Sequence, residues 1–154
     1  MELAQYCNNE ARMLAAADQL QLAEIRSQRA LELVEQLAAP TPTLSARMAE
    51  NLQLRGELLQ SQNPGEAEAL TDRAFDLLNK VDTNEANGAL YRNIGANYLE
   101  LAQYKLLNGD RTGAAAALSH LDEILPHLSA NDKKILIEPY QSLQKKLQKG
   151  PTRH

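Results

Sequence analysis

The chain has 154 residues, of which 44% are hydrophobic and 23% charged, so it is long enough to bury a core and ordinary in composition for a globular protein. Valine occurs only at Val34 and Val81, which leaves little material for a sheet and predicts an all-α fold. Residues 1–100 hold fifteen acidic and eight basic side chains, a net charge of −7, whereas residues 101–154 hold five and eight, a net charge of +3. The acidic body argues against general nucleic-acid binding.

Periodic apolar residues predict four helices in the N-terminal half, over residues 3–17, 20–37, 43–60 and 66–81. Asp18 either interrupts the first of these runs or bends it. Pro40 ends the second helix, because a proline disfavours helix in the residue before it. Thr43 or Ser45 is expected to cap the third helix. A turn at residues 63–65, which contains a proline and a glycine, separates the third helix from the fourth.

Three more helices are predicted in the C-terminal half, over residues 85–107, 110–125 and 129–148. Gly109 tolerates the left-handed conformation that ends one helix, and the aspartate after it can cap the next. Ser129 or Asn131 is expected to cap the last helix. Pro139 falls inside that helix and predicts a kink or a restart.

Three of the predicted helices share a spacing of small or apolar residues that lets each lie close against the helix before it. The positions are Ala23, Ser27 and Ala30, then Ala67, Thr71 and Ala74, then Ala114, Leu118 and Leu121. The offsets between the three sets are 44 and 47 residues. A near-constant period of this length predicts three helical hairpins stacked side by side, none of which can bury its apolar face alone.

The third predicted hairpin carries a more specific motif. Its residues are Tyr91, Ile94, Gly95, Tyr98, Gly109, Asp110, Ala114, Leu118, Leu121 and Pro126. This arrangement resembles the tetratricopeptide repeat, in which a large aromatic residue, a leucine–glycine pair and a tyrosine precede a second helix that a proline closes. Tyr98 stands eleven residues before Gly109, so the first helix is longer than in the usual repeat, and Leu118 replaces an aromatic residue. The second hairpin matches more loosely, and the first only in its second helix.

The resemblance implies a right-handed superhelix of about three antiparallel helical hairpins, closed by a C-terminal capping helix, for about seven helices in all. It implies a single tetratricopeptide-like domain over residues 1–149, followed by a frayed tail at residues 150–154. An irregular helical bundle is the alternative within the all-α class.

Candidate catalytic and metal-binding residues are few. His120, Glu123 and His127 have helical spacing, but Pro126 ends the helix before His127, so a solvated helix end is the favoured interpretation. Cys7 has no histidine near it in sequence and is interpreted as a small core residue. The sequence has no glycine-rich phosphate motif. We therefore expect no enzyme activity, no cofactor and no metal.

Two further groups of side chains are interpreted as structural. Tyr91, Tyr98 and Tyr104 are expected to pack in the core rather than to stack on a ligand. The last helix is rich in lysine, at Lys133, Lys134, Lys145, Lys146 and Lys149. A solvated capping helix is favoured over contact with an anionic membrane, nucleic acid or an acidic partner.

If the chain is a superhelix, the first helix of each hairpin lines a concave surface on which a partner binds. The candidate partner-binding residues are Arg47, Asn51 and Arg55 on the third helix and Arg92, Asn93, Asn97 and Glu100 on the fifth. Arginine and asparagine can hold a peptide through its backbone or a carboxylate. The expected function is an adaptor or chaperone that binds a peptide or helix of another protein. The alternative is a regulatory module that senses a small ligand or signalling peptide and controls a transcriptional or signalling partner.

The expected setting is the cytoplasm. The first twelve residues lack the basic region and the continuous apolar run of a signal peptide, and no stretch approaches the roughly 20 apolar residues that cross a bilayer. Direct nucleic-acid binding is not expected. A homodimer is left open, because an open helical stack has apolar ends that a second copy could cover.

Overall fold

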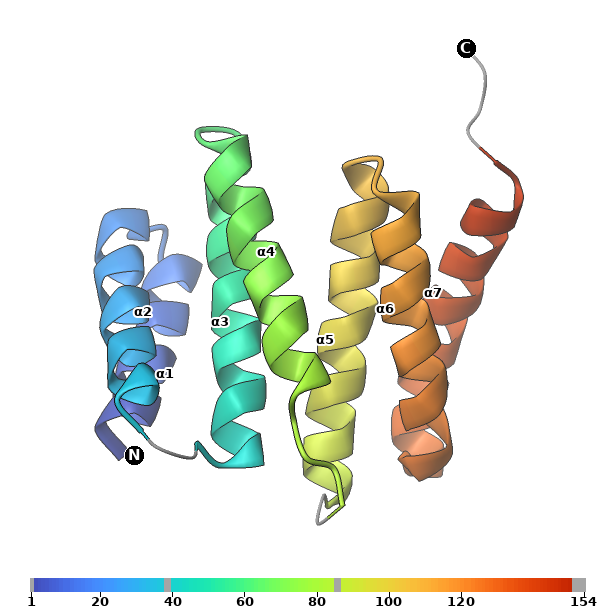
Figure 1. Cartoon of the computed structure of the whole chain (residues 1–154), viewed down its shortest axis with the longest axis horizontal. Coiled ribbons are helices and arrows are strands. Elements are labelled where there is room, and N and C mark those ends of the chain that lie inside the picture. The colour runs from blue at the N-terminus through green and yellow to red at the C-terminus, as the bar shows by residue number, and fades with distance from the viewer. Residues whose placement is uncertain (1, 38–39, 85–86, 151–154) are drawn as a thin grey trace. The chain divides into compact units, whose positions relative to one another are not determined.

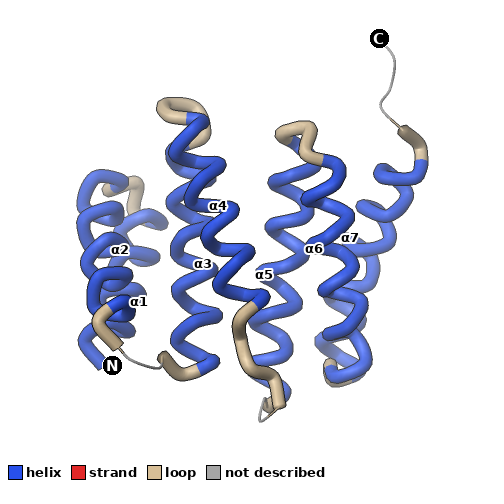
Figure 2. The backbone as a smooth tube through the Cα atoms, viewed as in Figure 1, coloured by secondary structure: helices blue, strands red, loops and turns tan. Residues whose placement is uncertain are grey.

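The computed structural model describes residues 2–37, 40–84 and 87–150. Within these ranges the chain forms α-helices, one short 3₁₀ turn and no strand, so the all-α prediction is confirmed (Figure 2). The elements are α1 (Glu2–Ala16), α2 (Leu20–Glu35), α3 (Pro42–Leu59), α4 (Pro64–Asn79), α5 (Gly88–Leu107), α6 (Arg111–Ile124), η1 (Leu125–His127) and α7 (Ala130–Gln148).

The helices group into two compact units, over residues 1–83 and 84–154, and each is described by itself. In the first unit α1 pairs with α2 and α3 pairs with α4, and α3 also contacts α1 and α2 (Figure 1). In the second unit α5 pairs with α6, and α7 packs against both. The three predicted hairpins are therefore present. The superhelix, the tetratricopeptide resemblance and the single domain over residues 1–149 stay predictions.

Pro42 and Pro64 are the first residues of α3 and α4, so these prolines begin helices rather than only ending the segments before them. Thr41 caps α3, and its Oγ1 accepts a hydrogen bond of 3.3 Å from the Leu44 amide. The prediction that Thr43 or Ser45 caps this helix is therefore wrong. The first helical position leaves its N–H unpaired in any case, so a proline such as Pro42 is well suited to it.

The end of α1 and the start of α5 can also be compared with the predictions from the sequence. Asp18 interrupts the first run, because it has a positive φ of 59° in the turn after α1. Asn87 caps α5 through a bond of 2.9 Å from the Leu90 amide, so α5 begins at Gly88. The predicted start at Glu85 lies outside the described residues.

The last helix, α7, continues through Pro139 without the restart that the sequence suggested. Ser129 caps it as predicted, through a bond of 3.1 Å from the Asp132 amide. A proline removes one helical hydrogen bond, but burial of Leu136 and Tyr140 on the inner side of α7 favours one continuous helix. The four lysines of α7 and Lys149, which follows it, are exposed, as expected of a solvated helix.

The recurring small residues form the contacts that hold each hairpin together. All nine positions of the repeated pattern are buried. At Gly56 the approach is closest, since a Cβ there would stand 2.9 Å from the Ala67 carbonyl oxygen and 2.7 Å from Thr71 Oγ1. Helices α3 and α4 thus pack backbone against backbone, as the sequence pattern predicted.

Two of the three tyrosines of α5 stack on histidines of the following elements. The ring centroids of Tyr91 and His127 are 4.6 Å apart, and the angle between the two ring planes is 8°. The ring centroids of Tyr98 and His120 are 5.2 Å apart. Burial raises the pKa of Tyr98. Tyr98 is therefore a core residue, as expected, and His120 is partly covered rather than free in solvent.

Candidate partner-binding site

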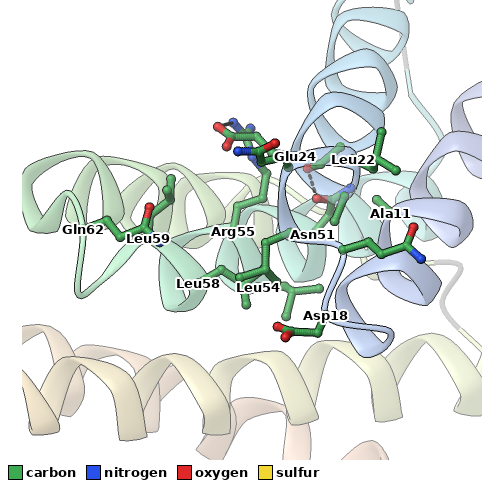
Figure 3. Close-up of a pocket in the computed structure, with 15 residues that line it drawn as sticks. Ala11, Asp18, Leu22, Glu24, Asn51, Leu54, Arg55, Leu58, Leu59 and Gln62 are labelled. Carbon is green, nitrogen blue, oxygen red and sulfur yellow. Dashed lines mark hydrogen bonds and ion pairs between the residues drawn. The ribbon is translucent and has the colours of Figure 1, made fainter.

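A cavity of about 560 Å³ opens in the first unit, between the α1–α2 turn, the start of α2 and the second half of α3 (Figure 3). Its lining combines leucines with amides and charged groups. The lining residues are Ala11, Asp18, Gln19, Leu20, Gln21, Leu22, Ala23, Glu24, Ser27, Asn51, Leu54, Arg55, Leu58, Leu59 and Gln62.

A buried chain of hydrogen bonds runs behind the cavity and ties three helices together. Asn51 of α3 donates from Nδ2 to Asn8 Oδ1 of α1, and Ser27 of α2 donates from Oγ to Asn51 Oδ1. All three side chains are at most 2% exposed. Each bond replaces a lost contact with water and so offsets part of the cost of burying these groups, whereas Asn8 Nδ2 is buried without a hydrogen-bond partner.

One helical turn after Asn51, Arg55 places a guanidinium group in the same wall. It is only 7% exposed. Its Nη1 donates to Gln28 Oε1 at 3.3 Å, and its Nη2 lies 3.3 Å from Glu24 Oε1. The Glu24 carboxylate compensates the buried positive charge, which would otherwise be costly. Figure 3 shows Asn51 and Arg55 projecting from α3 toward the helix that carries Glu24.

The remaining wall of the cavity is apolar. Leu54, Leu58 and Leu59 of α3 are half-buried, and Leu20 and Leu22 of α2 join them in the lining. An apolar pocket of a few hundred cubic ångströms with a small number of fixed polar groups is the usual form of a ligand-binding site. The cavity can therefore hold an apolar side chain and offer hydrogen bonds beside it.

Two of the three residues predicted on α3 line this cavity. Asn51 and Arg55 do so, although both are engaged by neighbouring helices. Arg47 is two turns away from Arg55 and does not belong to the lining; its Nη1 donates to Asn9 Oδ1 of α1 at 3.4 Å. The role of these residues in partner binding stays a prediction.

The residues predicted on α5 belong to the second unit. Arg92 is exposed and lies 3.6 Å from Asp132 of α7 as an ion pair. Asn97 is buried, Asn93 is half-buried and Glu100 is exposed. These four residues therefore do not share one accessible face of α5, and their role also stays a prediction.

The sequence did not single out Glu24, Ser27 or the three leucines of α3 as site residues. Ser27 had a signal, because it occupies a small-residue position, but that position indicated close packing rather than a cavity. Leu54 and Leu58 are one turn apart and are spaced like ordinary core leucines. Whether such leucines line a cavity or fill a core depends on the distance between the helices, and their spacing in the sequence does not give that distance.

Among the described residues, no group of three or more histidine, cysteine, aspartate or glutamate side chains is placed to hold a metal ion. Within the same ranges, the helices are too short or too polar to cross a membrane. No protein-family model, curated protein or solved structure matches the chain.

Proposed function

We propose that the chain is a non-enzymatic protein-interaction module, an adaptor or chaperone that binds a peptide or helix of a partner protein. The observation that carries the proposal is the cavity of about 560 Å³, in which the buried Arg55, paired with the partly exposed Glu24, and the buried Asn51 stand beside half-buried leucines. The sequence resembles tetratricopeptide-like hairpins, which bind peptides in their grooves. This resemblance supports the same kind of binding by this chain.

Recognition would use two kinds of contact. An apolar side chain of the partner enters among Leu54, Leu58 and Leu59 and displaces water from them. The partner's backbone then meets groups already held in place by their own hydrogen bonds, of which Arg55 and Glu24 are a donor and an acceptor. The ion pair leaves little net charge in the wall, so a neutral peptide segment fits the site better than a highly charged one.

A second candidate is the sensor module. Small-molecule sites commonly measure about 300–1,000 Å³, and the volume of the cavity, about 560 Å³, lies inside that range. In this alternative a small ligand fills the cavity and the chain then controls a transcriptional or signalling partner.

The test is affinity capture from native lysate with mass spectrometry, using the wild-type chain, Leu58→Glu and Gln62→Trp. Leu58→Glu places a charge in the apolar wall, and Gln62→Trp fills the cavity from an exposed position that folding tolerates. Leu107→Glu, at an exposed apolar position of α5, is the matched control. We expect a specific protein to be retained by wild type and control and reduced at least about tenfold by both cavity variants.

Equal retention by all four proteins would contradict a binding role for the cavity. Circular dichroism of each variant separates loss of binding from loss of fold. A thermal-shift screen with metabolites distinguishes the sensor, because a ligand that binds only the folded state raises the midpoint of unfolding. Stabilisation by a small molecule but by no captured protein would favour the sensor over the adaptor.

A further inference from the structure

A second hollow, of about 750 Å³, adjoins the cavity of the candidate site. It is lined by six residues on one face of α2, at positions 21 to 32, together with Arg55 of α3 and Glu66 of α4. Gln21, Glu24 and Arg55 line both spaces, so the candidate site continues along α2 beyond the Arg55–Glu24 ion pair. We name this space the second hollow.

The length of the second hollow indicates how much of a peptide it can hold. Gln21 and Glu32 are eleven positions apart, and at 1.5 Å per residue this face of α2 is about 16 Å long. An extended peptide rises about 3.3 Å per residue, so about five of its residues span the second hollow and about ten reach the cavity as well. Arg55, which is 7% exposed, is held beside Glu24 where the two spaces meet, so this part of the wall is fixed before a partner binds (Figure 3).

The charges that line the second hollow do not cancel. Its two arginines are each paired with a glutamate of α2, at 3.3 Å. The third carboxylate belongs to Glu66, which accepts a hydrogen bond of 2.9 Å from Asn63 Nδ2. Among the described residues, no basic side chain forms an ion pair with Glu66. The second hollow therefore carries one negative charge that no basic group of the chain compensates.

The surroundings of the second hollow do not supply the missing positive charge. Past its end on α2, Glu35 forms an ion pair with Arg73 of α4, and this pair adds no net charge. Residues 1–83 as a whole carry thirteen acidic and seven basic side chains, a net charge of −6. A field of this sign attracts a basic segment and repels an acidic peptide or a polyanion.

We propose that the second hollow binds a lysine or arginine side chain of the partner segment whose apolar side chain enters the cavity. This inference rests on the proposed function and adds the chemistry of the partner to it. Long basic side chains pack their carbon stems on apolar surface and leave the charged end at a polar group. Here Ile25, which is 61% exposed, receives the stem, and Glu66 receives the charge. The part of the segment that enters the cavity is uncharged.

The test is selection of random peptides of about ten residues, displayed on phage, with the full-length chain as the target. We expect the selected peptides to combine an apolar residue with a lysine or arginine, and to contain fewer acids than the unselected library. Fluorescence anisotropy then measures the Kd of the most frequent peptide for the wild type and two variants. Glu66→Gln keeps an acceptor for Asn63, so α4 stays capped, and we expect it to raise the Kd about two- to fivefold. Glu68→Gln removes the same charge from an exposed position of α4 outside the second hollow, and we expect an unchanged Kd.

Replacing the basic residue of the peptide by alanine tests the same contact without any change to the chain. We expect this replacement to weaken binding more for the wild type than for Glu66→Gln, because the variant has already lost the charge. Selected peptides with no excess of basic residues, or equal effects of Glu66→Gln and Glu68→Gln, would overturn the inference. Leu58→Glu distinguishes that result from failure of the proposed function, because a peptide that no longer binds this variant still uses the cavity. A peptide that binds Leu58→Glu as tightly as the wild type, or the selection of no peptide at all, contradicts the proposed function and the inference together.

Discussion

Gly56 is the residue at which α3 and α4 come closest, and it gives a sharp test of the packing. A Cβ at this position meets the Ala67 carbonyl oxygen at 2.9 Å, and backbone cannot move away as a side chain can. We expect Gly56→Ala to lower the free energy of unfolding by about 1–3 kcal/mol, the usual cost of overpacking. Urea unfolding followed by circular dichroism measures this change.

Gly65→Ala, on the first turn of α4, is the control for that substitution. Its nearest neighbour is Asn63 Oδ1 at 4.0 Å, so the added methyl meets open space. Alanine is the better helix former, and we expect a neutral effect or a gain of up to about 1 kcal/mol. Equal effects of the two substitutions would show that propensity, not close approach, governs Gly56.

At this scale the sequence predicted packing well and burial of polar groups poorly. Ala67 and Thr71 were recognised because small residues at helical spacing have one common use, which is close approach. Asn51 was predicted to be a surface residue that meets a partner, yet it is 1% exposed. Asn51 is buried because it donates a hydrogen bond to Asn8, which is 43 residues away in sequence. No local sequence pattern predicts a bond between residues so far apart.

Helix starts show what local sequence can and cannot decide. Ser129 was one of two predicted caps for α7, and the structure selects it. The cap of α3 was predicted two or four residues too late, because Thr41 lies between two prolines that both resembled helix breakers. A proline ends the segment before it and suits the first turn of the helix after it, so its neighbours alone do not fix which role applies.

The cap of α6 gives a prediction that depends on pH. Asp110 Oδ1 accepts a bond of 2.8 Å from the Gly113 amide, and its other oxygen lies 3.2 Å from the Lys105 ammonium. The backbone bond, aided by Lys105, lowers the pKa of Asp110 below its ordinary 3.8. A lowered native pKa stabilises the fold fully above 3.8, and that stability is lost as the pH falls through the native value.

We therefore expect Asp110→Ala to lower the free energy of unfolding by about 1 kcal/mol at pH 7, the usual value of an N-cap. The difference from wild type should shrink as the pH falls below 3.8. Chemical denaturation at a series of pH values measures it. Asp110→Asn keeps an acceptor for Gly113 and should cost less; a penalty for Asp110→Ala that is constant with pH would contradict a role for the charge.

At the scale of the whole molecule, composition and spacing predicted the all-α class and the three hairpins. Both depend on contacts between neighbouring helices, and these contacts require a periodic spacing of apolar and small residues in the sequence. The division between residues 83 and 84 has no such sequence pattern. In a chain of similar helices, the loop between two hairpins looks like the loop within one hairpin.

The two predicted groups of binding residues lie in different units. Asn51, Arg55 and the cavity belong to residues 1–83, whereas Arg92 and Asn97 belong to residues 84–154. We expect residues 1–83, produced alone, to be helical by circular dichroism, because α1 to α4 bury their small residues against one another. This segment should retain the captured partner.

Residues 84–154 are the matched counterpart, since they hold a hairpin and a covering helix of their own. Partner capture by this segment alone would move the site to α5 and would contradict the assignment to the cavity. If residues 1–83 are helical but do not capture the partner, the assignment to the cavity is contradicted as well.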